Sequence, residues 1–194
     1  MPDDPHDATA ERFLTGQLLL AMPQLRDPPF HQAVIVICAH TPDGAMGLIV
    51  NRPLSQPSFP DLLEQLGIEP PHGRSIRLHD GGPVEGQRGF VLHTADWSGE
   101  GTLKIDGRLA VTASLDVLRS IATGQGPAQG LLALGHAGWG GGQLEREILD
   151  NAWLTVPAGN LDVIFGTEDA AKWRRALATL RIDPARLSNA AGHA

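Results

Sequence analysis

The sequence is poor in cysteine and lysine: of its 194 residues, one is cysteine and two are lysine. The cysteine, Cys38, cannot form an internal disulfide and lies in the apolar run 33–39, so we expect a buried thiol. No apolar run approaches the roughly 20 residues that a membrane-crossing helix needs. The N-terminal segment also lacks the pattern of a secretory signal. These absences favour a cytoplasmic protein that makes no membrane contact.

Positive charge is scarce as well. Lysine and arginine together number 15 against 22 acidic residues, which gives a formal net charge of -7. Neutralisation of phosphates supplies most of the non-specific affinity for nucleic acid, so an acidic chain is poorly suited to it. The sequence also shows no helix-turn-helix with a basic recognition helix. We therefore expect no direct binding to nucleic acid.

The overall composition is that of a globular protein, with 42% hydrophobic and 19% charged residues. A chain of this length buries enough apolar surface to fold as one domain. The polar segment 1–12 has no apolar periodicity and is expected to be a loose tail. The single domain is expected to span 13–194.

Short apolar runs rich in branched residues predict buried strands along most of the chain. They lie at 16–21, 32–39, 47–51, 74–79, 89–94, 103–106, 109–113, 129–135, 153–156 and 161–165. The turn residues at 41–45 join the second and third of these runs into a hairpin. Irregularly placed helices among many strands indicate an α+β protein rather than a doubly wound one. We expect a mostly antiparallel sheet, bent or barrel-like, covered by about four helices.

The helical segments show apolar residues at spacings of three and four. Ser58 and Ser114 are placed to cap the first two helices, a third begins at Gln143, and a final one opens at Thr167. The last helix is expected to bury a stripe formed by Trp173, Ala176, Leu177 and Leu180. Lys172, Arg174 and Arg175 are interpreted as its solvated face.

The glycine-rich segment Gly138–Gly142 lies between a predicted strand and a predicted helix, where backbone amides can hold an anion. It lacks the signature of a nucleotide-binding P-loop. Glu145 and Glu147 fall in the first turns of the helix, where carboxylates complement the dipole and Glu145 can act as a cap. Three interpretations stay open. They are an anion site, a self-capped structural turn, and a site for a neutral or cationic ligand held by Glu145, Glu147, His136 and Asn51.

Three segments run from a glycine through apolar residues to a polar side chain, and they end at Asn51, His93 and His136. The glycines can mark bulges while the polar ends satisfy loop amides, or the polar groups can gather around a ligand. On the second interpretation, the site lies around the loops after Val50, Leu92 and Gly135. The candidate binding residues are Asn51, Arg52, His93, His136, Trp139, Gln143, Glu145 and Glu147.

The sequence assigns no catalytic residue. Eight histidines are present, but none shows a close metal-ligand spacing, so no metal or cofactor is expected. There is no G-x-S-x-G motif, and Asp80, His93 and His136 cannot be shown to be adjacent. A binding module is therefore favoured over an enzyme, and an enzyme acting on a small molecule remains the alternative.

Several separated blocks make the chain resemble the AlgH/YqgE family of uncharacterised bacterial proteins. The blocks that carry the resemblance are Gly16–Pro23, Gly44–Pro53, Gly81–Val84, Arg88–His93, Gly135–Trp139 and Gly142–Glu145. At one position the chain departs from the family, because His136 stands where a tyrosine is usual.

The resemblance implies a single α+β domain with a contorted, barrel-like sheet, and it implies no established reaction. One family name carries the label of transcriptional regulator. Without a basic surface for DNA, we interpret such regulation as indirect, through an unidentified small molecule or protein partner. Direct binding to DNA is the second alternative.

Overall fold

The computed structural model describes residues 13–69, 72 and 74–189, so the predicted tail 1–12 lies outside the described residues. Nine strands occur in the described part: β1 (Gln17–Ala21), β2 (Val34–Thr41), β3 (Gly44–Ile49), β4 (Arg77–Asp80), β5 (Val84–Thr94), β6 (Thr102–Lys104), β7 (Leu109–Thr112), β8 (Gly130–Gly140) and β9 (Trp153–Pro157). Six helices accompany them: α1 (Phe59–Gln65), α2 (Leu115–Ala122), α3 (Gln143–Leu149), α4 (Asp162–Phe165), α5 (Asp169–Thr179) and α6 (Pro184–Asn189).

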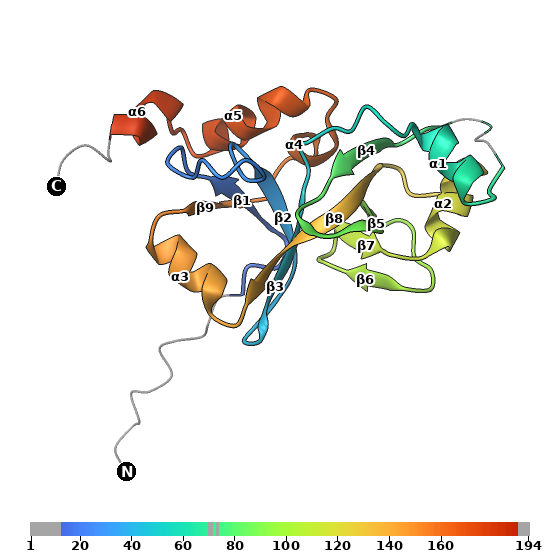
Figure 1. Cartoon of the computed structure of the whole chain (residues 1–194), viewed down its shortest axis with the longest axis horizontal. Helices are drawn as coiled ribbons and strands as arrows, with labels where there is room; N and C mark the ends of the chain where they lie inside the picture. Colours follow the sequence, from blue (N-terminus) through green and yellow to red (C-terminus); the bar gives the residue numbers. More distant parts are fainter. Residues whose placement is uncertain (1–12, 70–71, 73, 190–194) are drawn as a thin grey trace, which may run out of the picture.

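The strands form one curled sheet in the order β6-β7-β5-β8-β3-β2-β1-β9, with β4 paired to β8 outside this path. Figure 1 shows β8 crossing the middle of the molecule, with β1, β2 and β9 on one side and β5, β6 and β7 on the other. Every pairing is antiparallel except that of β4 with β8. The expected α+β class, with a mostly antiparallel, barrel-like sheet in a single domain, is confirmed.

The backbone of β8 passes close to the loop after β4. Gly135 has a φ of 76°, and a Cβ atom there would lie 2.4 Å from the carbonyl oxygen of Gly82. A Cβ atom on Gly82 would in turn lie 2.2 Å from the carbonyl carbon of His136. Since no L side chain fits such approaches, glycine is required at both positions. Gly135, inside one of the three glycine-led segments, therefore marks a close approach of two backbone segments.

Apolar side chains form three clusters on the faces of the sheet. The largest lies between the strands and α5, where Trp173, Ala176 and Leu177 are buried. The second contains Leu144 of α3 against β1, β2 and β3, and the third joins α1 and α2 to β5 and β8. The predicted stripe of the last long helix is confirmed for these three residues, and the helices cover both sheet faces.

Several local predictions are confirmed. The hairpin of β2 and β3 turns between Thr41 and Gly44. The Oγ atom of Ser58 accepts a hydrogen bond from the N–H of Asp61 at 3.2 Å, so this serine caps α1. Cys38 is 1% exposed, and burial raises the pKa of its thiol to about 12. Ser114 occupies the N-cap position of α2, but its hydroxyl donates to the carbonyl of Glu100 instead of capping.

Two predicted segments have a different backbone. Residues 161–165 were expected as a strand, but they contain α4, because the side chain of Asn160 accepts a hydrogen bond from Asp162 N and favours a helical turn. The expected loop at Gly138–Gly142 is shorter than predicted. β8 continues to Gly140, since its last residues pair with β3, and strand pairing overrides the weak strand propensity of glycine.

The start and the outer face of the last predicted helix also need correction. Glu168 occupies the N-cap of α5 in place of Thr167, and α6 follows, so α5 is not the final helix. Arg174 and Arg175 are exposed as expected, whereas Lys172 is 1% exposed. Its ammonium group is buried because acceptors from three segments meet there, as described below.

Candidate functional site

The predicted residues of α3 and its surroundings form a closed set of contacts around Glu147. One carboxylate oxygen accepts hydrogen bonds from the indoles of Trp139 and Trp153, at 2.9 and 2.8 Å. The other accepts from the amide of Gln143 at 2.9 Å, while the carbonyl oxygen of that amide accepts from Gly140 N at 3.0 Å. The side chains of this set hydrogen-bond to one another and to the backbone. These contacts favour the interpretation of the segment as a structural turn.

Glu145 is engaged with a buried histidine of β2 and does not reach back to cap α3. The N–H of Leu14 donates to Nδ1 of His40 at 3.0 Å, so Nε2 carries the proton and donates to Glu145 at 2.6 Å. The backbone N–H of Glu145, and then the bond from His40, lower the pKa of the carboxyl group. Through His40, this carboxylate is linked to the backbone at Leu14, shortly before β1.

The two predicted histidines lie apart from α3. His93 is fully buried, with Nδ1 at 2.8 Å from the carbonyl of Thr94 and Nε2 at 2.8 Å from the hydroxyl of Thr112. Burial lowers its pKa and favours the neutral ring. His136 packs edge-on against Phe90, and its Nδ1 lies 3.8 Å from Glu85, with no hydrogen-bond partner in the described part of the chain.

Asn51 and Arg52 follow β3 and lie at a different place. The side chain of Asn51 accepts from Val34 N at 2.9 Å and donates to the carbonyl of Gln32 at 2.8 Å. Arg52 donates to the carbonyl of His31 through Nη2. Burial lowers the pKa of Arg52 and the carboxylate of Asp80 opposes this, so the guanidinium stays charged. The structure thus divides the predicted set among four locations.

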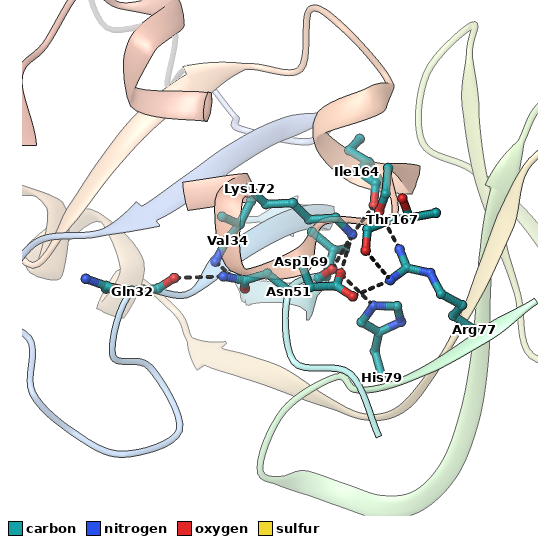
Figure 2. A network of polar contacts seen from close by, with 11 residues as sticks. Gln32, Val34, Asn51, Arg77, His79, Ile164, Thr167, Asp169 and Lys172 are labelled. Atoms are coloured by element: carbon teal, nitrogen blue, oxygen red, sulfur yellow. Dashed lines mark hydrogen bonds and ion pairs between the residues drawn. The ribbon is translucent and has the colours of Figure 1, made fainter. Parts of the chain in front are cut away.

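A buried ionic network outside the predicted set of residues shares a pocket lining with Asn51 and Arg52. Figure 2 shows it beside Asn51. Its centre is Asp169, in the first turn of α5. One carboxylate oxygen lies 3.0 Å from Nε2 of His79 and 2.8 Å from Nζ of Lys172, and the other accepts from Arg77. Figure 2 shows Lys172 and Arg77 approaching the carboxylate from opposite sides.

The cations of this network also bind backbone carbonyls. Nζ of Lys172 donates to the carbonyls of Val50 and Ile164 at 2.7 and 2.6 Å, which completes its three hydrogen bonds. Arg77 donates to the carbonyls of Gly166 and Thr167. The network therefore joins the exit of β3, strand β4 and the loop before α5.

The protonation states follow from this geometry. Burial raises the pKa of Asp169, but the hydrogen bonds from His79 and Lys172 outweigh it and hold the pKa at about 2. Burial lowers the pKa of Lys172, and the bond from Asp169 opposes it. Because Nε2 of His79 donates to Asp169, its other nitrogen, Nδ1, is left buried without a partner among the described residues.

A hollow of about 350 Å³ opens beside the network. We call it the Arg52 hollow, and it is lined by Gln32, Asn51, Arg52, Pro53, Asp169, Ala170 and Trp173. The indole of Trp173 is fixed by a hydrogen bond to the carbonyl of Ala21 at 2.9 Å. Hydrogen bonds therefore hold the amide, the carboxylate and the indole of this wall in place.

One feature of the sequence indicates part of the network. Asp169 and Lys172 lie three residues apart, and Lys172 precedes the stripe residue Ala176 by four, so all three share one helix face. A lysine on a buried face needs acceptors, which predicts a polar cluster beneath the helix. The sequence gives no corresponding indication for Arg77 and His79. These two side chains approach Asp169 only because β4 pairs in parallel with β8.

Among the described residues, no three histidine, cysteine or acidic side chains lie close enough together to share a metal ion. The helices of this same part of the chain include none with the length and hydrophobicity of a membrane span.

The curled antiparallel sheet with helices on both faces defines a class of single-domain α+β proteins. Within it, the chain belongs to the AlgH-like family, whose model matches residues 18–185. A UPF0301 protein of Gluconobacter oxydans is 56% identical over 187 residues, which cover 95% of this chain and 100% of the relative. A UPF0301 protein of Rhodospirillum rubrum is 53% identical over 185 residues, which cover 95% of this chain and 96% of that protein.

Two solved structures share the architecture. The solution structure of the AlgH protein from Pseudomonas aeruginosa matches with a TM-score of 0.76 and 41% identity over 100% of both chains. The crystal structure of a protein from Corynebacterium diphtheriae matches with a TM-score of 0.71. The match covers 97% of this chain and 94% of the Corynebacterium protein. At 19% identity, this second likeness shows the fold alone. The resemblance inferred from the sequence blocks is confirmed.

Proposed function

We propose that this protein is a ligand-binding module that takes a small carboxylate or phosphate in the Arg52 hollow. Its regulatory role is indirect, through a protein partner that distinguishes the bound from the empty form. The observation that carries the proposal is the guanidinium of Arg52, a charged group on the wall of a preformed hollow.

Arg52 has capacity for an anion. A guanidinium carries five N–H donors in a planar fork that matches carboxylate and phosphate oxygens. One bond of Arg52, to the carbonyl of His31, is made within the described residues. The carboxylate of Asp169, on the same wall, is neutralised by the cations behind it. Among the residues that line the hollow, an incoming anion therefore meets the positive charge of Arg52 beside a carboxylate that is already paired. The carboxylate of Asp80, outside this lining, offsets part of that charge.

The rest of the wall supports binding of a small molecule. Pro53, Ala170 and Trp173 supply apolar contact, and Asn51 is held by two hydrogen bonds. Hollows of about this volume with a few fixed polar groups are typical ligand sites. A preformed wall also reduces the entropy lost on binding.

The structure gives the enzyme alternative less support. His79 and Asp169 form an oriented pair of the kind used in acid-base chemistry. However, His79 is fully buried, so a substrate in the Arg52 hollow does not reach its ring. Binding without chemistry accounts for the arrangement with fewer assumptions.

A ligand screen tests the proposal. Succinate, citrate, inorganic phosphate and pyrophosphate are added to the protein, and the melting temperature is followed, since a ligand that binds the folded state raises it. The best anion is then titrated into Arg52→Met, Arg52→Lys and the control Arg119→Met, whose arginine is exposed on α2. We expect binding to be lost in Arg52→Met, weakened in Arg52→Lys and kept in the control. Equal binding by Arg52→Met, or no shift with any anion, would contradict the proposal.

A further inference from the structure

A second cavity lies at the opposite end of the sheet from α5, and it shares no lining residue with the Arg52 hollow. It lies between α1, α2 and the sheet strands β5 and β8, with a volume of about 240 Å³. We call it the leucine pocket, because six leucines line it: Leu62, Leu66, Leu115, Leu118, Leu132 and Leu134. We propose that it binds a short aliphatic chain, either free or as the acyl or alkyl part of a larger molecule.

The pocket has a buried floor and an exposed rim. At the floor, Leu132 and Val91 are each 2% exposed, and Leu118 is 5% exposed. At the rim, Leu66 and Leu115 are 39% and 40% exposed. A narrow chain reaches the floor, whereas a broad protein surface meets only the rim. The depth of the pocket therefore selects a chain over a flat partner.

Two of the three polar side chains that line the pocket, those of Thr112 and Ser114, are already engaged in hydrogen bonds. The hydroxyl of Thr112 lies 2.8 Å both from Nε2 of His93 and from the hydroxyl of Thr102. The hydroxyl of Ser114 donates to the carbonyl of Glu100 at 2.9 Å. Since a buried polar ligand atom needs a partner, these contacts disfavour a polar occupant at the floor. Gln87 lines the pocket too, and its exposed position suits the polar end of an amphiphilic chain.

The size and lining are also consistent with this ligand class. An apolar cavity of roughly 150 Å³ is enough to stay dry and bind benzene. The leucine pocket is larger, and its lining contains no aromatic ring for stacking. Branched aliphatic walls contact an alkyl chain along its whole length, and burial of the chain and of the exposed rim leucines removes apolar surface from water.

The test uses primary alkanols from butanol to dodecanol as uncharged probes, titrated into the whole protein by calorimetry and followed by the leucine methyl signals in NMR. We expect affinity to rise about threefold or more with each added methylene until the pocket is full, and then to level off. The methyl signals of Leu132 and Leu118 are expected to shift first. Absence of binding, or affinity without dependence on chain length, would overturn the proposal.

Variants locate the site. Leu134→Phe fills the half-buried side of the pocket and is expected to weaken alkanol binding at least tenfold. Leu103→Phe, at a 50% exposed leucine of β6, is the matched control and should bind as the wild type does. If Leu134→Phe does not fold, Leu115→Gln at the rim replaces it, with the same expected direction. Unchanged binding in the pocket variant would place the alkanols elsewhere and refute the site.

Further arms separate the alternatives. Decanoic acid represents a free fatty acid, and neutral phosphatidylcholine vesicles represent a lipid. Binding of either one that is lost in Leu134→Phe supports the proposal that the pocket takes an aliphatic chain. Should sedimentation show a dimer that Leu66→Gln disrupts and no alkanol bind, a second copy covers the pocket and the proposal fails. Arg52→Met is expected to bind alkanols normally, so the failure of one proposed site is distinguishable from the failure of the other.

Discussion

Single carboxylates hold together segments that lie far apart in the sequence. Glu147 receives hydrogen bonds from β8, from α3 itself and from β9. Asp169 does the same for α5 and β4. Hydrogen bonds to an ionised group are stronger than those between neutral groups, and an unmade one inside a protein is costly. Loss of either carboxylate should therefore lower the free energy of unfolding by more than the loss of an exposed carboxylate does.

Substitution at α3 tests this at the scale of one residue. Glu147→Gln keeps the shape but removes the charge and turns an N–H₂ group towards at least one donor, so we expect a loss of about 2 kcal/mol in the free energy of unfolding. Glu145→Gln, at a side chain that is 47% exposed, is expected to cost less than about 1 kcal/mol. Urea denaturation measures both. Equal midpoints for wild type and Glu147→Gln would show that the set of contacts around this carboxylate is not structural.

Among helices and strands, α5 depends on the ionic network beneath it. Lys172 connects this helix to the carbonyl after β3, and Arg77 brings β4 to the loop before it. The helix also packs Trp173 and Leu177 onto the sheet. Removing one member of such a network leaves an uncompensated charge, whereas protonation of the carboxylate weakens all its contacts together.

Acid titration tests the network. The pKa of Asp169 is about 2 in the folded protein, below its ordinary value of 3.8. As the pH falls, this carboxylate is therefore protonated in the unfolded chain before it is protonated in the folded one. The carboxylate therefore stabilises the fold above pH 4, and this contribution is lost as the pH falls towards 2. Between pH 5 and pH 3 we expect it to decline by about 1 kcal/mol.

Asp169→Asn should lack that part of the pH dependence, as measured by urea unfolding at both pH values. Asp116→Asn, at an exposed carboxylate paired with Arg119, is the control and should titrate as the wild type does. A pH profile of Asp169→Asn that superimposes on the wild type would refute the assigned role.

Elements with a strong local pattern were predictable from the sequence, and those set by distant contacts were not. The stripe of α5, the cap at Ser58 and the hairpin after Thr41 follow from spacing and turn residues. The segment 161–165 is a short apolar run, for which periodicity does not separate strand from helix. Lys172 was predicted to lie off the buried stripe, on the solvated face, but it precedes Ala176 by four residues and is 1% exposed.

The site was predictable only in fragments. Asn51 and Arg52 were identified as candidates, and they line the hollow that we propose as the ligand site. His79 and Arg77 were not, because they meet Asp169 through a pairing of β4 with β8 that no local pattern encodes. Long-range contacts of this kind depend on topology, which one sequence constrains weakly.

At the scale of the whole molecule, the chain carries a formal net charge of -7 over a curled sheet covered on both faces. A surface of this charge repels polyanions at long range, and proteins that bind DNA non-specifically depend on the opposite arrangement. Regulation through direct contact with DNA is accordingly disfavoured, and regulation through a ligand agrees with the cavities described.

We predict no binding to random duplex DNA at physiological salt beyond that of an acidic control protein. Fluorescence anisotropy with a labelled duplex, over a range of salt concentrations, measures this. Micromolar affinity that weakens steeply with salt would contradict the prediction and would indicate a cluster of phosphate contacts.

The place of β9 beside β1 has a consequence for biosynthesis. The first of the described strands pairs with the last, and the indole of Trp173 donates a hydrogen bond to the carbonyl of Ala21 at the end of β1. On the ribosome, the edge of β1 that does not pair with β2 is therefore uncovered until the chain has been made as far as Pro157. An open edge invites pairing with other chains, and late closure prolongs that exposure. We expect the nascent chain to need chaperone protection, and a truncation before Trp153 to aggregate where the full chain folds.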